Sequence, residues 1–303
     1  MTPKTVASLA ILALLGCRAR GGARGDRSDV VAVDRATDRA DAARATSSDG
    51  VSEASAAQGV RVHPRGHRCA WVGSAADVWR GEALSGDAAL EVGAMLRLGC
   101  PFEAHAAPWV DVRMPSGLGF SVGEDEALVE LSPLPGVAAT LLRGRLRAEV
   151  PRGALAPLRV DTAAGRVVLT EGSVELVAAR GLNGEVGPVT LRSLGATARR
   201  WRLVGDRAES EALPTRGERT WPAGAALGLD AAEAALNGAR VSLNDDAPSE
   251  AAQNVASLQL GVAAAQFGTR RASPARAPAE ARRTRELVML RDLVAGRLVR
   301  LAR

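Results

Sequence analysis

The chain has 303 residues, of which 47% are hydrophobic and 24% charged, and its formal net charge is +5. This length allows one large domain or two smaller ones with an apolar core, and the composition excludes a wholly disordered chain and a membrane protein with many spans. Lys4 is the only lysine among 39 basic residues, and only 3% of all residues are aromatic. Because proteins that bind single-stranded nucleic acid stack the bases on aromatic side chains, this class is disfavoured.

Residues 1–17 are typical of a secretory signal peptide. Lys4 provides a basic start, residues 6–15 are apolar, and Leu14-Leu15-Gly16-Cys17 closes the segment. The apolar run of about ten residues is too short to span a bilayer of about 30 Å as a helix. The closing residues resemble a bacterial lipobox, and the resemblance implies cleavage before Cys17 and attachment of lipid to its thiol. The alternative is an ordinary signal peptide in which Cys17 has no such role.

A lipidated Cys17 would anchor the mature chain to a membrane surface without spanning it. Arg18 rather than Asp follows Cys17, and the resemblance to enterobacterial sorting implies the outer membrane, with the protein facing the periplasm. Residues 18–60 carry balanced charges and few large apolar side chains. They are therefore predicted to form a disordered tether between the anchor and the folded part.

The chain contains three cysteines. If Cys17 carries the lipid, Cys69 and Cys100 remain, and this pair can form one disulfide in an oxidising envelope compartment. Closing the loop of about 30 residues between them would stabilise the fold by about 3 kcal/mol in the chain-entropy description. The alternative is two buried free thiols.

Residues 61–224 are predicted to form a mainly β domain of short strands, because apolar residues alternate with polar ones between turns rich in Gly, Pro and Asp. In the clearest case Leu146, Ala148 and Val150 alternate with charged residues, which are assigned to a solvated sheet face. Turn residues recur about every ten positions, which indicates an all-β sandwich, roll or solenoid. The other predicted strands include residues 110–114, 118–122, 158–162, 166–170, 173–177, 189–194, 200–204 and 218–221.

One stretch of this region, residues 158–176, resembles the core of FecR-type domains. The residues that carry the resemblance are Val160, Thr162, Val167, Gly172, Val174 and Leu176, with Leu142, Gly144 and Leu146 upstream. The resemblance implies a FecR-like all-β sandwich or roll that senses or binds on the envelope side of a membrane. Family members that regulate sigma factors add a cytoplasmic helical domain and a transmembrane segment, whereas this chain begins like a lipoprotein. The resemblance therefore implies only the sensing or binding domain of the family for this chain, and not the direct control of a sigma factor.

After Gly224 a helical periodicity replaces the alternation, so residues 225–269 are predicted to be helical. Asp230 is expected to cap a helix over residues 231–236, and the following Asn237-Gly238 to end it. A second helix is predicted over residues 248–267, with Asp246 or Ser249 as its cap.

Residues 270–303 are predicted to form a basic linker and an amphipathic helix over residues 279–302. This segment contains ten arginines and three acidic residues, whereas residues 61–269 are net acidic. The helix either packs on its own domain or on another copy of the chain, or lies on an anionic membrane surface or in the groove of a partner. The residues assigned to such a membrane or partner contact are Leu287, Leu290, Arg291, Val294, Arg297 and Leu298.

Two patterns resemble catalytic or metal sites. Residues 119–123 match G-x-S-x-G around Ser121, but the hydrolase motif needs a strand, a turn and a helix, with Asp and then His following the serine. All three histidines precede Ser121. His63, His67 and Cys69 offer metal donors, but a complete zinc site needs a further ligand. No catalytic residue, metal or cofactor is therefore assigned.

The sequence thus predicts a non-catalytic envelope lipoprotein with a FecR-like domain, which binds a ligand or a protein partner in sensing or envelope assembly. The alternative is a structural, self-associating envelope scaffold, and a serine hydrolase is the third possibility. The expected partners are a membrane, through the lipid anchor, and an envelope protein or a second copy of the chain. No nucleic acid is expected, because the excess positive charge belongs to the C-terminal segment.

Overall fold

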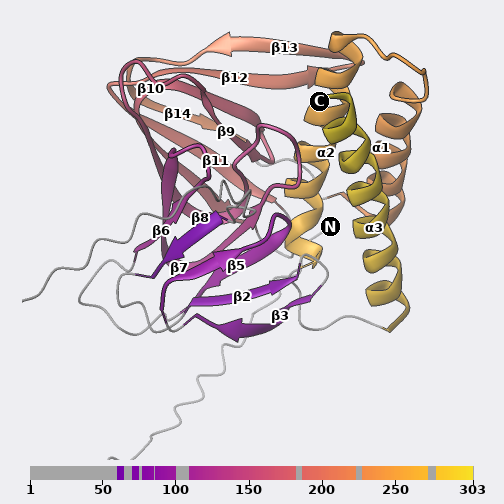
Figure 1. The fold of residues 1–303 in the computed structure, drawn as a ribbon, viewed down its shortest axis with the longest axis horizontal. Helices are drawn as coiled ribbons and strands as arrows, with labels where there is room; N and C mark the ends of the chain where they lie inside the picture. The colour runs from indigo at the N-terminus through magenta and orange to yellow at the C-terminus, as the bar shows by residue number, and fades with distance from the viewer. Residues whose placement is uncertain are drawn as a thin grey trace, which may run out of the picture. The chain divides into compact units, whose positions relative to one another are not determined.

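Fourteen strands and three helices make up the part of the chain that the computed structural model describes, which comprises residues 60–64, 70–74, 77–84, 86–99, 109–181, 186–222, 227–271 and 278–302. All of these belong to the second of two compact units of the chain, Glu53–Arg303. The strands are β1 (Val60–His63), β2 (Ala70–Ser74), β3 (Asp77–Ala83), β4 (Ala88–Leu90), β5 (Ala94–Leu98), β6 (Trp109–Arg113), β7 (Gly119–Leu131), β8 (Ala139–Val150), β9 (Leu158–Thr162), β10 (Gly165–Arg180), β11 (Val186–Leu194), β12 (Thr197–Val204), β13 (Arg207–Ala212) and β14 (Arg216–Trp221). The helices are α1 (Leu229–Ser242), α2 (Glu250–Arg271) and α3 (Pro278–Leu301). The prediction of a mainly β fold followed by a helical C-terminal region is confirmed (Figure 1).

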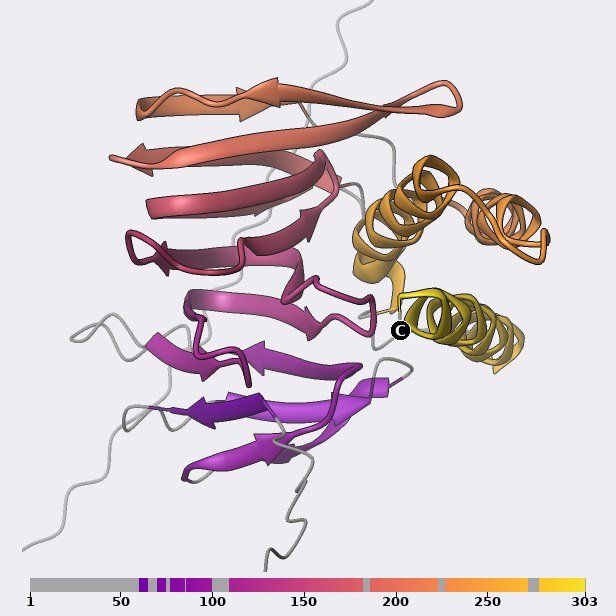
Figure 2. The same ribbon diagram turned by 45° about the horizontal axis from the view of Figure 1, so that its top comes forward.

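The strands form two layers that share the three long strands β7, β8 and β10. We call the first the helix-covered layer, and its strand order is β13-β12-β10-β9-β8-β7-β5-β2-β3. The second is the open layer, with the order β4-β1-β6-β7-β8-β10-β11-β14. Paired strands are antiparallel except for the parallel pair of β8 and β9. Figure 2 shows the strands stacked edge to edge, with the helices on one side.

Each long strand contributes one half to each layer. In β10, residues 165–169 pair with β9, whereas residues 172–178 pair with β8. Gly172 lies at the bend with a φ of 88°, and a Cβ atom there would lie 2.2 Å from the carbonyl oxygen of Gly195. Only glycine fits such a position. The two short strands predicted at 166–170 and 173–177 are thus one bent strand. The backbone changes direction at Gly172, but strand pairing continues on both sides of it.

The main apolar core lies between the two layers. Leu146, Ala148 and Val150 are at most 1% exposed, as the alternation predicted, and they join one buried cluster with side chains from both layers. Strand β13 was not predicted, because its sequence RAESEA lacks large apolar residues. Its pairing with β12 follows from the tight turn at Gly205, whose φ is 61°.

The helices differ from the predicted ranges mainly in α1. It continues beyond Gly238 to Ser242, because Leu236, Ala239 and Leu243 are buried in the helical core and this packing outweighs the weak helix propensity of glycine. For α2 the structure selects Ser249 as the cap, since the Ala252 N–H donates to its Oγ at 3.2 Å. Helix α3 lies within one residue of the predicted range at both ends.

Helix α2 lies on the outer face of the helix-covered layer, against β8, β9, β10, β12 and β13 (Figures 1 and 2). Gly261 and Gly268 are about two turns apart and face the strands. A Cβ at Gly261 would lie 1.8 Å from the Asp161 Oδ2 atom, and one at Gly268 would lie 1.4 Å from the Leu142 Cδ2 atom. These two glycines therefore permit the close approach of helix and sheet.

A buried ion pair on β9 and β10 connects this outer face to α2. The Asp161 carboxylate, which is fully buried, accepts hydrogen bonds from the Arg166 Nε and Nη2 atoms at 2.6 and 3.0 Å. Arg166 also donates to the Oγ and carbonyl oxygen of Ser257 in α2, both at 3.0 Å. The Arg166 guanidinium therefore links the sheet to the helix while Asp161 neutralises its charge.

A second buried ion pair connects the same face to α3. Glu130 on β7 is fully buried and pairs with Arg291, which is 4% exposed. Burial by itself lowers the pKa of Arg291, but the charges of Glu130 and Asp292 outweigh it, so that the pKa is raised. The guanidinium thus stays charged inside the interface. None of the described helices has the length and apolar character needed to cross a membrane.

Candidate functional site

Four turns meet at one end of the two layers and border a cavity of about 940 Å³ that is open to solvent, which we call the end cavity. Its walls come from the β4–β5 turn (residues 89–92), the β6–β7 hairpin (114–118), the β7–β8 loop (132–138) and the β8–β9 loop (156–159), with Val60 and Val299 between them. The volume falls in the range of small-molecule binding sites, which are typically concave and mostly apolar.

The β7–β8 loop is anchored to the helices, so this wall of the end cavity is formed in advance. Leu134 and Val137 are 5% and 4% exposed and belong to the apolar cluster of α1, α2 and α3. The Oγ of Ser132 accepts a hydrogen bond from the Leu134 N–H at 3.2 Å. Loops fixed in this way lose little conformational entropy when a ligand binds.

The backbone donors of the walls are largely used inside the fold. The Met114 N–H donates to the Leu118 carbonyl at 2.8 Å, the Val137 N–H to the Leu134 carbonyl at 3.2 Å, and the Ala138 N–H to the Arg159 carbonyl at 2.8 Å. Four further wall positions are prolines, which have no N–H to donate: Pro115, Pro133, Pro135 and Pro157. The walls consequently present mainly apolar side chains.

Arg159 is the one basic side chain among the wall residues. It is half-buried on β9, and its Nη1 donates to the Gly136 carbonyl at 3.3 Å. Burial and the nearby charge of Arg166 lower its pKa, whereas Asp161 raises it in part. Among the described residues, no carboxylate forms an ion pair with the Arg159 guanidinium, because Asp161 is engaged by Arg166.

The acidic side chain of the walls is Glu91, which is exposed on the β4–β5 turn. In the helix-covered layer, β9 and β5 are separated by β8 and β7. Three strand spacings correspond to about 14 Å, which separates the backbone of β9, with Arg159, from that of β5, which follows the turn with Glu91.

The stripe on α3 that was assigned to a membrane or partner contact is internal. Leu287, Arg291, Val294 and Leu298 are at most 4% exposed, and Leu290 packs against the same helical cluster. Arg297 donates to the carbonyl oxygens of Leu243 and Asp245. Leu287, Arg291, Val294 and Leu298 are therefore not exposed for such a contact, because α1, α2 and the sheet cover them, whereas Leu290 and Arg297 are only partly covered.

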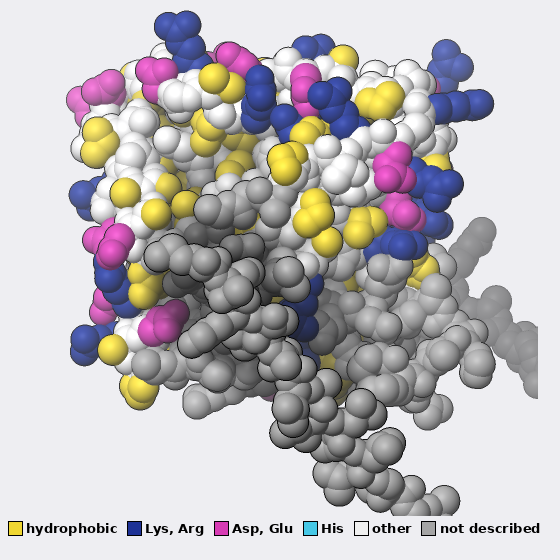
Figure 3. All heavy atoms as spheres, turned by 180° about the vertical axis from the view of Figure 1, so that it is seen from behind, with side chains coloured by type: hydrophobic (Ala, Val, Ile, Leu, Met, Phe, Trp, Pro, Cys, Tyr) yellow, Lys and Arg dark blue, Asp and Glu magenta, His cyan; other side chains and the backbone are white. Residues whose placement is uncertain are grey.

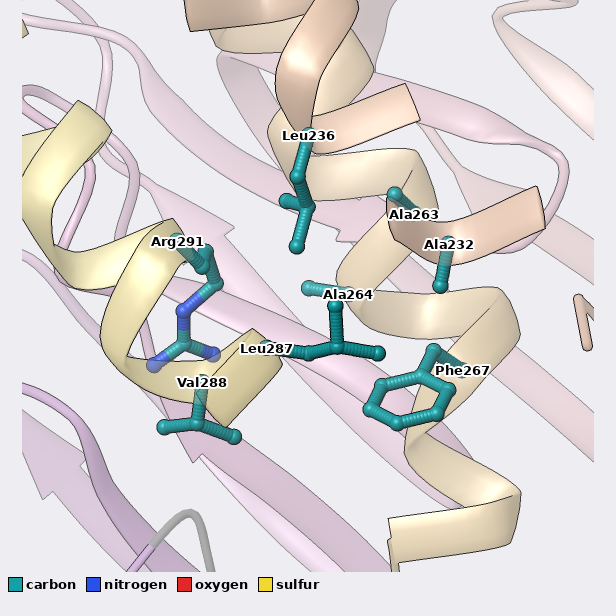
Figure 4. Close-up of a pocket in the computed structure, with 8 residues that line it drawn as sticks. All are labelled: Ala232, Leu236, Ala263, Ala264, Phe267, Leu287, Val288 and Arg291. Atoms are coloured by element: carbon teal, nitrogen blue, oxygen red, sulfur yellow. The ribbon is translucent and has the colours of Figure 1, made fainter. Parts of the chain in front are cut away.

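Figure 4 shows part of this packing, with Leu287 of α3 directed towards Ala264 and Phe267 of α2. Val288 and Arg291 face the sheet instead, where Val288 joins a cluster with Leu128 and Leu142 and Arg291 pairs with Glu130. The free volume that remains between these helices is about 10 Å³, which holds at most about one water molecule. The interhelical space is therefore a packed core and offers no ligand site.

Cys17, Cys69 and Cys100 lie outside the described residues, so lipidation and the disulfide stay predictions.

Ser121 lies on the outer face of strand β7, and its Oγ donates to the Asp111 Oδ1 at 2.6 Å. Cross-strand pairing places Asp111 between Ser121 and His63, and His63 contacts Asp87. A catalytic triad needs the imidazole between the serine and the carboxylate, so these residues do not have triad geometry. Within the described ranges, no three His, Cys, Asp or Glu side chains are grouped so as to hold a metal ion.

Charged side chains of both signs are interspersed on the face shown in Figure 3. On the open layer, outward-facing side chains of neighbouring strands form a row across the sheet. Ser121 is the cross-strand partner of Arg147, Arg147 that of Glu175, and Glu175 that of Arg192. Arginine and carboxylate thus alternate along this row.

The end cavity was not found from the sequence. Its prolines and glycines mark turns, as at Pro115 and Gly136, but such residues also mark the turns at the other end of the layers. Arg159 occupies an ordinary alternating position of a predicted strand. Only the strand order shows which four turns share an end, and that order depends on long-range pairing.

Comparisons of this chain with models of known protein families, with curated proteins and with solved structures found no match.

Proposed function

We propose that this protein is a non-catalytic lipoprotein of the bacterial cell envelope, whose FecR-like domain binds a ligand or a protein partner in sensing or envelope assembly. The end cavity is the observation that carries this proposal. It combines a volume of about 940 Å³ with mostly apolar walls and few polar groups, a combination typical of ligand sites. Its β7–β8 wall is held by the helical core, so the cavity exists before anything binds.

The proposed location follows from the N-terminal segment. Lipid on Cys17 would hold the chain at the membrane, facing the periplasm, and residues 18–60 would act as a flexible tether. A flexible chain of that length has a root-mean-square reach of about 35 Å. Partition of the mature protein into detergent, lost in Cys17→Ala, tests the anchor; equal partition of the two proteins would contradict it.

Photo-crosslinking in the envelope tests binding at the end cavity. A photoreactive amino acid at Val92, which lines the cavity and is 63% exposed, is compared with one at Val204, which is 43% exposed on the distal β12–β13 turn. We expect a defined adduct, either a small molecule or a protein, from position 92 and none from position 204. Equal labelling at both positions, or no adduct at either, would contradict the proposal.

The second candidate function is a self-associating envelope scaffold. It is favoured by two large apolar side chains on the outer face of α3, Met289 at 71% and Leu293 at 64% exposure. Light scattering across a range of concentrations separates the two functions. A mass that rises with concentration, and no longer does so in Leu293→Glu, would favour the scaffold. A constant monomer mass would exclude it.

A further inference from the structure

We propose that the end cavity binds an amphiphile with a long apolar chain and a single anionic head group, and that the head group lies at Arg159. This inference rests on the proposed function, because it takes the end cavity as the binding site and specifies the chemical class of its ligand. Three features of the walls lead to it: the engaged backbone donors, the arginine that pairs with no carboxylate among the described residues, and the separation of the strands that carry the two charged wall residues.

The walls favour an acyl chain over a peptide. An extended peptide carries a donor and an acceptor at every residue, and these groups need partners when they are buried. Peptide-binding grooves supply such partners from a free strand edge. Here the edge strand that the described walls contain is β4, which has three residues. The donors of Met114, Val137 and Ala138 are engaged within the fold, and four other wall positions are prolines. A hydrocarbon chain needs no such partners, and it gains from contact with the apolar side chains.

Arg159 determines the chemistry of the head group. The Arg159 Nη1 donates to the Gly136 carbonyl, and a Cβ at Gly136 would lie 2.5 Å from that nitrogen, so the guanidinium rests against this turn. Asp161 binds Arg166 through both of its carboxylate oxygens. The remaining donors of Arg159 are therefore available to a carboxylate or a phosphate group, which arginine binds through paired hydrogen bonds.

Glu91 determines the orientation of the ligand. Its carboxylate would repel an anionic head group at the β4–β5 end of the cavity, about 14 Å from β9 by strand spacing. The anionic end of the ligand is therefore directed to Arg159, and the apolar chain extends past Leu118 and Leu90 towards Val92.

Calorimetric titration of the mature full-length chain tests this assignment with four compounds of equal chain length. Dodecanoate and dodecyl phosphate carry anionic heads, dodecyl maltoside is neutral, and dodecyltrimethylammonium is cationic. We expect the two anions to bind and to compete with each other, and the cation to bind at least about tenfold more weakly. Dodecanoate binding tighter than dodecyl phosphate, or the reverse, distinguishes a fatty-acid head from a phosphate head. Equal affinity for all four compounds would overturn the role of Arg159.

Variants identify the residues that bind. Arg159→Gln should weaken dodecanoate binding about tenfold without changing that of dodecyl maltoside, and Arg159→Lys should restore part of it. Arg207→Gln is the matched control, because Arg207 is exposed at the start of β13, far from the end cavity. Glu91→Gln should strengthen the binding of both anions. Unchanged dodecanoate affinity in Arg159→Gln, with the unfolding midpoint also unchanged, would overturn the proposal.

A second pair of variants tests where the apolar chain of the ligand lies in the end cavity. Val92→Trp should weaken the binding of every dodecyl ligand because it narrows the end cavity, whereas Val204→Trp should leave their affinities unchanged. A protein adduct at position 92 in the envelope, together with no dodecanoate binding, would overturn the proposal of an amphiphilic ligand but would agree with the proposed function. No adduct and no dodecanoate binding would overturn both.

Discussion

The outer faces of the two strand layers carry similar polar residues but have different environments. On the helix-covered layer, Glu130 and Asp161 are fully buried and each binds an arginine within the helix–sheet interface. On the open layer, Glu175 also binds arginines, but the Arg145 and Arg147 side chains remain 33% and 52% exposed. The same residue types therefore join two parts of the fold on one face and form a solvated surface on the other.

This difference shows that an alternating strand does not by itself reveal which polar face is solvated. The charged residues opposite Leu146, Ala148 and Val150 on β8 lie on the open face, as predicted. Arg166 and Asp161 occupy equivalent alternating positions, yet the helix α2 covers them. Removing a charge should consequently have a large effect on one face and a small effect on the other.

The largest effect is expected for Asp161→Asn. It leaves the buried Arg166 guanidinium without a counter-charge, which should lower the free energy of unfolding by about 3–5 kcal/mol. Urea unfolding followed by circular dichroism measures this loss. Asp246→Asn is the control, because Asp246 is exposed between α1 and α2. A loss below about 1 kcal/mol, the usual value for exposed pairs, would mean that α2 does not cover this face in solution.

The next effect concerns the close contact between α2 and the sheet. In Gly261→Ala the added Cβ would lie 1.8 Å from the Asp161 Oδ2 atom, and such overpacking should cost about 1–3 kcal/mol. Gly238→Ala is the matched control in α1, where the nearest side-chain atom to the added Cβ is 4.0 Å away. It should be stabilising by up to about 1 kcal/mol, because alanine favours a helix. Equal denaturation midpoints for the two variants would argue against the close packing of α2.

A smaller effect is expected for Glu175→Gln on the open layer. Glu175 is itself 7% exposed, but its arginine partners are partly solvated, so the loss in the free energy of unfolding should be about 1–2 kcal/mol. High salt should reduce the difference from the wild type, since salt screens exposed pairs. A loss as large as that of Asp161→Asn would show that another part of the chain or a partner covers the open face.

The smallest effect is expected for Ser121→Ala. The substitution removes one half-buried hydrogen bond to Asp111, which should change the free energy of unfolding by less than about 1 kcal/mol. Hydrolysis of a short-chain nitrophenyl ester should be the same for both proteins. Hydrolysis that is present in the wild type and abolished by this substitution would restore the serine hydrolase as the function.

Much of the local structure could be predicted from the sequence. The periodicity of residues 279–302 predicted α3 within one residue at both ends, and the alternation around Leu146 predicted the inward side of β8. The strand β13 was missed, since its small polar residues carry no apolar alternation. The end of α1 was placed too early at Asn237-Gly238, because burial of Leu243 extends the ordered helix beyond a local stop signal.

The candidate site was less predictable than the fold. No sequence motif marked Arg159 or Val92 as site residues, because the cavity that they line is formed by four turns that are distant in sequence. The apolar stripe at Leu287 and Leu298 was visible, but a helix that packs on its own sheet and one that binds a partner have the same periodicity. Their burial depends on α1 and α2, which the pattern of α3 does not encode.

The sequence by itself determined the order of β and helical regions, the inward residues of the main strands and the concentration of positive charge after residue 269, because these depend on local spacing and composition. The tertiary structure decided that Gly172 joins two predicted strands into one, that Asp161 and Glu130 bind helices, and that four turns border the end cavity. Each of these features depends on contacts between residues far apart in the chain, which local periodicity does not specify.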